Sequence, residues 1–148
     1  MKIIGIILLT IASALLYNSY SLSETKKSEV VQLDMEFYSR LVKSNPLSRD
    51  TFLNELQGGL FQGRGYVESV TKSERYHRHF RITAIENSAG DFNVRLYIFT
   101  DNEEYLNLLK KGDLFDFKGQ FVVFTPLNSR RDSYIFDIIL EEGALSVK

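Results

Sequence analysis

Residues 92–121 read FNVRLYIFTDNEEYLNLLKKGDLFDFKGQF and carry the strongest indication of the fold class. From Phe92 to Thr100 apolar residues alternate with polar ones, which is the period of a half-buried strand. A short helical segment follows and ends at Lys110-Lys111-Gly112, because cations suit the negative end of a helix and glycine accepts a positive φ. Alternation then resumes from Leu114 to Phe124. The stretch predicts a strand, a helix and a second strand.

The start of the predicted helix carries a capping-box sequence, Thr100-Asp101-Asn102-Glu103. In a capping box the first hydroxyl accepts a hydrogen bond from an exposed backbone N–H, and the acid three residues later reaches back. The helix that follows carries Tyr105, Leu108 and Leu109. We therefore expect the helix to begin directly after Thr100.

On both sides of this stretch, the same alternation with a period of two predicts three further strands. They cover residues 60–70, about 76–86 and 134–141, with an NSAGD turn at 87–91 and a loop at 125–133. Three strands, a helix and two strands is the order of an OB fold, an all-β, five-stranded Greek-key barrel with a helix between strands three and four. The expected inward residues are Val67, Phe80, Ile82, Ala84, Phe92, Val94, Leu96, Ile98, Phe115, Phe117, Phe121, Phe136, Ile138 and Leu140. Asp137 alternates inward beside its neighbours or sits at a bulge, and we expect it to pair with a buried polar group.

One or two N-terminal helices precede the barrel. From Glu29 to Val42 apolar residues recur at helical spacing, which predicts an amphipathic helix that stops before Asn45-Pro46. A second short helix is expected after Ser48, with Asp50 in its first turn, and Gly58-Gly59 ends it.

Three segments of the barrel carry a resemblance to a known family. Residues 61–68 (FQGRGYVE), 104–113 (EYLNLLKKGD) and 115–121 (FDFKGQF) resemble the tRNA-anticodon-binding-like, nucleic-acid-binding OB superfamily. In that group a first strand with a G-x-V-like core and an LKKGD…F-x-G segment that enters strand four are typical. The resemblance covers residues 60–142 and implies the OB fold and a binding activity.

The N-terminus predicts export. Met1-Lys2 precedes an uncharged apolar run at residues 3–17, which has the length of a signal-peptide core and is short for a membrane-spanning helix. The alternative is an uncleaved inner-membrane anchor, the chain's single membrane contact. Either interpretation places the body in the periplasm, in the cell envelope or outside the cell. The expected organisation is residues 1–23 as signal or anchor, 24–59 as tether and helices, and 60–148 as the barrel.

Composition limits the function classes. The chain has 148 residues, which supports one domain, and a net charge of −1, so no global field attracts nucleic acid or anionic lipid. It has no cysteine, which excludes disulfides, thiolate catalysis and cysteine-based zinc sites. Any electrostatic attraction must therefore come from local clusters.

The outer face of strands two and three is where OB domains usually bind. Period two assigns to this face a set that is rich in cations and aromatic rings and holds no acid. It comprises Arg64 and Tyr66 from strand one, His77, His79, Arg81 and Thr83 from strand two, Asn93, Arg95, Tyr97 and Phe99 from strand three, and Arg130 and Arg131 from the loop before strand five.

This set suits an anionic oligomer. Arginine forks bind phosphate or carboxylate, and a base or sugar stacks on Tyr66, Tyr97 or Phe99. The ligand class is single-stranded nucleic acid, an oligosaccharide or an acidic peptide. The alternative is a face without a ligand, in which Tyr66 and Tyr97 are a stabilising cross-strand pair and Glu68, Glu103 and Glu104 neutralise neighbouring cations, or which the N-terminal helices cover.

No catalytic motif or cofactor site is predicted. His77 and His79 form an H-x-H pair on one side of the predicted strand, but no third metal ligand is specified. Nucleophile-elbow and phosphate-loop sequences are lacking. The main hypothesis is a non-enzymatic binding module. The alternative is a structural protein of the envelope that docks on a protein partner through the helix at 29–42 and the barrel.

Overall fold

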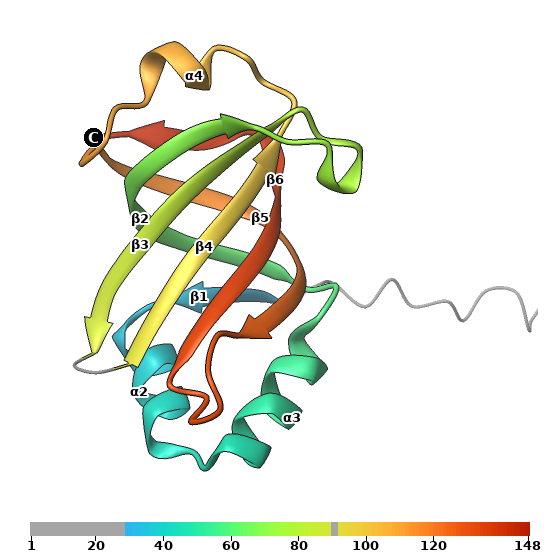
Figure 1. Ribbon diagram of the computed structural model, residues 1–148, viewed down its shortest axis with the longest axis vertical. Helices are drawn as coiled ribbons and strands as arrows, with labels where there is room; N and C mark the ends of the chain where they lie inside the picture. The colour runs from blue at the N-terminus through green and yellow to red at the C-terminus, as the bar shows by residue number, and fades with distance from the viewer. Residues whose placement is uncertain (1–28, 90–91) are drawn as a thin grey trace, which may run out of the picture.

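The strand β2 (Leu60–Lys72) pairs with two other strands of the barrel and with one strand outside it, and the barrel closes through it. The computed structural model describes residues 29–89 and 92–148. In chain order the other elements are β1 (Val30–Leu33), α2 (Met35–Lys43), α3 (Pro46–Leu56), the 3-10 turn η1 (Arg75–His77), β3 (Phe80–Ala89), β4 (Phe92–Thr100), α4 (Tyr105–Leu108), β5 (Leu114–Pro126) and β6 (Ser133–Val147). Figure 1 shows α4 at one end of the barrel and α2 and α3 at the other.

The strand order is β2-β3-β4-β6-β5, and β5 returns to β2. The first half of β2 pairs antiparallel with β5, from Leu60 to Tyr66, and the second half pairs antiparallel with β3. The strands β4 and β6 are parallel neighbours. This is the predicted five-stranded barrel with a helix between its third and fourth strands, so the predicted fold is confirmed.

The barrel interior holds every side chain that the alternation placed inward, and all of them are buried. Phe61 and Phe121 stack at its centre with ring centroids 4.3 Å apart and planes 10° apart. The strands β5 and β6 cross tightly at Gly119, where an added Cβ would overlap the Ile139 carbonyl oxygen. Burial of aromatic rings from all five strands is the main apolar stabilisation of the fold.

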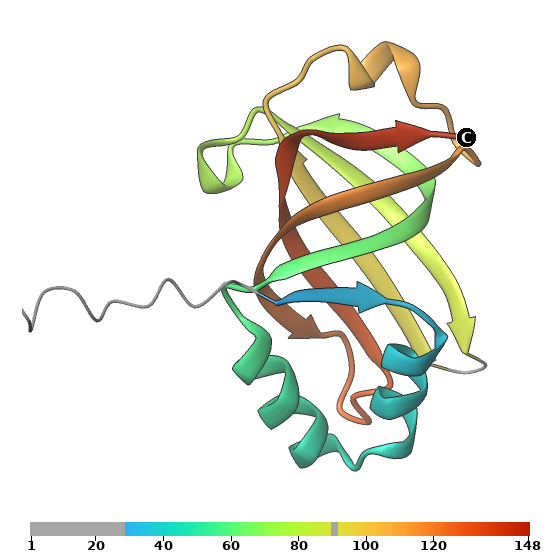
Figure 2. The ribbon, with the colours of Figure 1, turned by 180° about the vertical axis from the view of Figure 1, so that it is seen from behind.

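The predicted helix at 29–42 was wrong in its first part. Val30–Leu33 forms β1, which pairs parallel with β2 from Leu60 to Gly63 (Figure 2). The helix α2 begins only at Met35, because the Asp34 carboxylate caps it by accepting the Phe37 N–H at 3.0 Å. The apolar spacing continued through both elements, so it did not distinguish the strand from the helix.

The two helices close one end of the barrel, which we call the helical end. Phe37, Tyr38 and Leu41 of α2 and Leu53 of α3 are buried there. The helix α3 begins earlier than predicted, at Pro46, because the Asn45 side chain accepts the Ser48 N–H at 2.9 Å and proline suits the first helical turn.

The capping box predicted before α4 does not form. The Thr100 hydroxyl accepts the N–H of Asn102 at 3.1 Å, and the Asn102 side chain accepts the N–H of Glu104 at 3.0 Å. These two local turns delay the helix to Tyr105. The predicted end at Lys110-Lys111-Gly112 was also wrong, since the helix stops at Leu108; Gly112, with a φ of +92°, lies in the turn that follows.

Several strand boundaries differ from the prediction. The second barrel strand begins at Phe80, because residues 75–77 form η1, and it runs on to Ala89. The last strand extends to Val147. The export segment at 1–23 and the tether up to Ser28 lie outside the described residues, as do Gly90 and Asp91 of the predicted turn. None of the helices within 29–89 and 92–148 is long and apolar enough to span a membrane.

Candidate binding face

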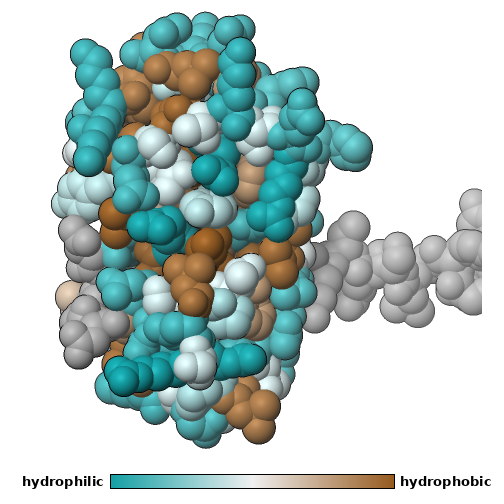
Figure 3. All heavy atoms as spheres, in the orientation of Figure 1, coloured by the Kyte–Doolittle hydropathy of each residue, from teal (hydrophilic) through white to brown (hydrophobic). Residues whose placement is uncertain are grey.

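The outward sides of β2, β3, β4 and β6 form one surface, which we call the outer face and which faces the viewer in Figure 1. The register sets neighbours across it: Arg81 lies opposite Phe99, Thr83 opposite Tyr97 and Ile85 opposite Arg95. Figure 3 shows a small hydrophobic group in the middle of this surface with hydrophilic residues around it. The partly exposed apolar side chains of these rows include Ile85 and Ile135.

Arg81 and Tyr97 lie in contact on the outer face, and both are half-buried. The Arg81 guanidinium carbon lies 4.4 Å from the Tyr97 ring centroid, a cation–π geometry. No carboxylate of the described residues forms an ion pair with Arg81, and its Nε is buried without a hydrogen-bond partner among them. Arg81 therefore keeps its charge available to a ligand beside an aromatic surface.

The other predicted strand arginines of this face are paired with acids. Arg95 Nε lies 3.3 Å from a Glu68 carboxylate oxygen, as the alternative without a ligand anticipated. Arg64 Nε lies 2.8 Å from Asp116. Hydrogen bonds from Lys148 and Arg64 lower the pKa of Asp116, so this carboxylate stays charged and cancels much of the local positive potential. The expectation of an acid-free face was wrong, because acids from β5 and the bulged part of β2 reach the cations.

The two histidines do not share one face of a strand. His77 lies in η1 with a φ of 56°, and His79 lies just before β3. His79 Nδ1 is 2.9 Å from Asp101, whose pKa is lowered chiefly by the hydrogen bond from Arg78. Within the described residues no three His, Asp or Glu side chains are grouped as metal ligands. The H-x-H spacing was misleading because the chain turns between Arg75 and Phe80.

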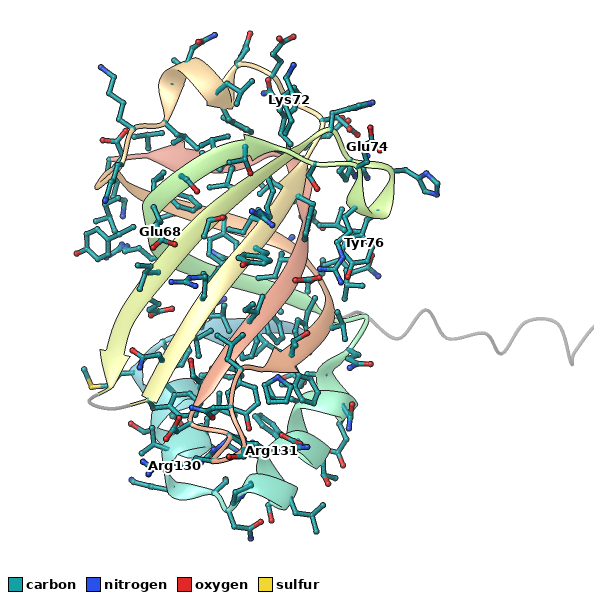
Figure 4. The ribbon with its side chains drawn as sticks, viewed as in Figure 1. Glu68, Lys72, Glu74, Tyr76, Arg130 and Arg131 are labelled. Atoms are coloured by element: carbon teal, nitrogen blue, oxygen red, sulfur yellow. The ribbon has the colours of Figure 1, made fainter. Side chains whose placement is uncertain are left out.

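Arg130 and Arg131 lie at the helical end, away from Arg81. Arg131 forms an ion pair with Asp50 of α3, and its carbonyl oxygen accepts a hydrogen bond from Arg49. Figure 4 shows Arg130 and Arg131 beside the helices, whereas Lys72, Glu74 and Tyr76 lie toward the opposite end. Arg130 is exposed, and Arg131 holds its loop against α3.

Tyr66 stays exposed at 45%, on the β2 side of the outer face. It lies opposite Ile85, so it does not form the cross-strand pair with Tyr97 that the alternative required. Thr83 and Phe99 also point outward but are buried. The N-terminal helices do not cover Phe99; the ring of Tyr76 does, with centroids 5.0 Å apart and planes at 80°.

Sequence reasoning missed the loop from Ser73 to His79, which we call the β2–β3 loop. Its Tyr76 hydroxyl donates to Asp137 Oδ2 at 2.7 Å, and Arg75 reaches the same oxygen at 3.1 Å. Asp137 is 1% exposed, so the predicted pairing of this buried acid is confirmed, but its partners are half-buried and exposed and not the buried polar group that was expected. It lies on the outward side of β6, opposite Tyr97, and not in the interior. The strict alternation of Phe136, Asp137 and Ile138 already carried this signal.

Comparisons with known proteins do not assign this chain to a family. No protein-family model matches the chain, and no curated protein matches it in sequence. Among solved structures, asparaginyl-tRNA synthetase from Entamoeba histolytica is 14% identical with a TM-score of 0.43, over 82% of this chain and 24% of that chain. Aspartyl-tRNA synthetase from Entamoeba histolytica is 12% identical with a TM-score of 0.41, over 71% of this chain and 23% of that chain.

An OBody bound to hen egg-white lysozyme is 14% identical with a TM-score of 0.39, over 63% of this chain and 84% of that chain. The chain thus spans about a quarter of the length of the synthetases that it matches. Similarity at these scores does not indicate an activity. The strand order identifies the fold, and the outer face is the surface that indicates a function.

Proposed function

We propose that this protein is a non-enzymatic binding module that holds single-stranded nucleic acid on its outer face. The contact between Arg81 and Tyr97 is the observation that carries the proposal. It offers an unpaired guanidinium for a phosphate next to a ring on which a base can stack. Sequence-tolerant single-strand binding needs these two elements, a cation and an aromatic platform.

The pairing of the other cations limits the strength and salt dependence of this binding. Arg64, Arg95 and His79 each have an acidic partner, so few phosphates gain a new counter-charge. On single strands each neutralised phosphate contributes about −0.7 to the slope of log affinity against log salt. We therefore expect a slope of roughly −1 to −2, with stacking as a large share of the affinity.

The test is a binding titration with a fluorescent thymidine strand of about ten nucleotides. Arg81→Ala should weaken binding roughly tenfold, and Tyr97→Ala by a similar factor because a stacked base loses its platform. Arg64→Ala is the matched control, since it removes a paired arginine and should leave affinity nearly unchanged. Equal losses in Arg81→Ala and Arg64→Ala, or tighter binding of an acidic peptide or an oligosaccharide, would contradict the proposal.

The competing hypothesis is docking on a protein partner through the segment at 29–42 and the barrel. Phe37, Tyr38 and Leu41 of α2 are buried within the molecule and are not free for a partner, while Met35 and Val42 of the same helix stay exposed. The contact of Arg81 with Tyr97 favours nucleic acid over this alternative.

Export remains a proposal that rests on the uncharged apolar run at 3–17. It places the barrel in the periplasm or envelope, either free or anchored at the inner membrane. N-terminal sequencing of the native protein after cell fractionation tests it. A cytosolic protein that retains Met1 would overturn it.

A further inference from the structure

Asp137 is an unusual residue for the outside of a sheet. It lies between Tyr97 of β4 and Val123 of β5 in the strand register, yet only 1% of its surface is exposed. A buried carboxylate costs free energy unless partners satisfy it. Here both partners, Tyr76 and Arg75, come from the β2–β3 loop and reach the same oxygen, Oδ2. The loop therefore covers an acceptor that would otherwise face the ligand.

The conformation of the β2–β3 loop is itself costly. Tyr76 and His77 have φ angles of 57° and 56°, and neither is a glycine. Such residues are strained and persist only where the surroundings hold them, typically at binding or switching sites. The contacts that hold this one are the hydrogen bond of Tyr76 to Asp137 and the edge contact of its ring with Phe99. Figure 4 shows Tyr76 reaching from the loop to the side of β6.

Tyr76 presents two chemical features to the outer face, a flat ring and a hydrogen-bond donor. Burial and the bond to Asp137 raise the pKa of Tyr76 to about 12, so the hydroxyl stays a donor at neutral pH. A nucleobase has the same two features. Guanine is the best match, because two N–H groups on one edge fit the two oxygens of a carboxylate, whereas thymine offers a single N–H.

The position next to Arg81 and Tyr97 fits a strand of several bases. Tyr97 and Phe99 are two residues apart on β4, so their rings stand about 7 Å apart on the same face. Phe99 also lies directly opposite Arg81 in the register. A base stacked on Phe99 would thus lie next to a base stacked on Tyr97. Arg81 would then be near the phosphate that links these two bases.

We propose that Phe99 and Asp137 form a guanine-selective base subsite, which Tyr76 fills until a strand displaces it. This inference rests on the proposed function and adds to it a specificity that the Arg81–Tyr97 contact lacks. Tyr76 is then a competitor for the subsite, and Asp137 is the residue that reads the base.

The test uses two probes of about ten nucleotides, an all-thymidine strand and the same strand with one central guanine. Tyr76→Ala opens the subsite, so it should bind the guanine strand roughly tenfold more tightly than the wild type does and the thymidine strand almost unchanged. Adding Asp137→Asn should remove that gain, because the amide replaces one acceptor oxygen with a donor. An equal effect on both probes, or a gain that survives Asp137→Asn, overturns the subsite.

Two controls keep the outcome decisive. If Tyr76→Ala does not fold, Tyr76→Gly carries the test, since glycine accepts the φ of 57° at this position and uncovers both Phe99 and the carboxylate; a guanine-selective gain supports the subsite, and its lack overturns it. Arg81→Ala separates the two proposals. If thymidine binding depends on Arg81 but no variant gains guanine selectivity, only the subsite fails. If the wild type binds neither strand, the proposed function fails.

Discussion

The two ends of the barrel are closed by different kinds of contact. At the helical end, α2 and α3 bury Phe37, Leu41 and Leu53, and a buried polar cluster joins the helices to the loop before β6. In that cluster the Tyr134 hydroxyl donates to Asp50 at 3.1 Å. At the opposite end, α4 is a helix of four residues, and the β2–β3 loop is held by exposed pairs such as Arg78 with Asp101.

This difference between the two ends indicates that one end stabilises the barrel and the other end takes part in binding. Apolar burial and buried hydrogen bonds at the helical end are costly to open, so this end fixes the barrel. Exposed ion pairs are individually weak, so the pair of Arg78 with Asp101 can open at little cost, whereas Tyr76 can leave the buried Asp137 only where a ligand replaces its hydrogen bond. The outer face runs between the two ends, and we expect ligand-linked change only on the side of the loop.

The largest expected effect is at the helical end. Phe37 packs edge-to-face on Phe61 at 5.8 Å and on Phe136 at 6.4 Å. Phe37→Ala should lower the free energy of unfolding by about 3–5 kcal/mol in urea titrations, because it leaves a cavity in the core. Met35→Ala on the same helix is the control, since Met35 is 77% exposed and should change little. Similar effects of both variants would show that α2 does not close the barrel.

A carboxylate from each end gives the next contrast. Asp50→Ala leaves the buried Tyr134 hydroxyl without its acceptor and Arg131 without its partner, and should cost about 1–3 kcal/mol. Asp101→Ala removes the exposed partner of Arg78 and His79 and should barely change the melting temperature. If Asp101→Ala were the more damaging of the two, the loop end would be the structural one.

A smaller effect depends on pH. Burial raises the pKa of Glu86, near the C-terminal end of β3, to about 7 from 4.5, and the Asp34 carboxylate adds to the rise while Tyr38 offsets part of it. A raised acid pKa in the folded state favours the protonated form, so its stabilisation is complete below about pH 4.5 and is lost as pH rises through about 7.

Between these pH values the wild type should therefore lose about 1–2 kcal/mol relative to Glu86→Gln, after allowance for the partial exposure of this side chain. Denaturant midpoints of both proteins across this pH range check the prediction. Parallel curves would mean that Glu86 is not buried against α2.

The inside of the barrel could be predicted because alternation is a local property. Each inward residue, such as Phe80, Leu96 or Phe117, is followed by one that points out. The same parity assigned Arg81 and Tyr97 to the outer face. Parity fails where the chain leaves the strand, which is why His77 was misplaced. The start of α2 was misplaced for another reason, since helical spacing of apolar residues also runs through β1.

The pairing of charges could not be predicted in the same way. Arg64 meets Asp116, which is 52 residues away, and Tyr76 meets Asp137, which is 61 residues away. Such partners are determined by the β2–β5 register and by the path of one loop. Neither can be predicted from a local sequence pattern. The free charge of Arg81 is visible only once these long-range pairs are known.

We propose that a ligand binds on the outer face around Arg81 and Tyr97. Backbone amide chemical shifts of nitrogen-15-labelled protein, followed during titration with the thymidine strand, test it most directly. We expect the largest shifts in β3 and β4 near these two residues and in the β2–β3 loop, with α2 and α3 unchanged. Shifts that gather on the helices, or a spectrum that does not move, would contradict it.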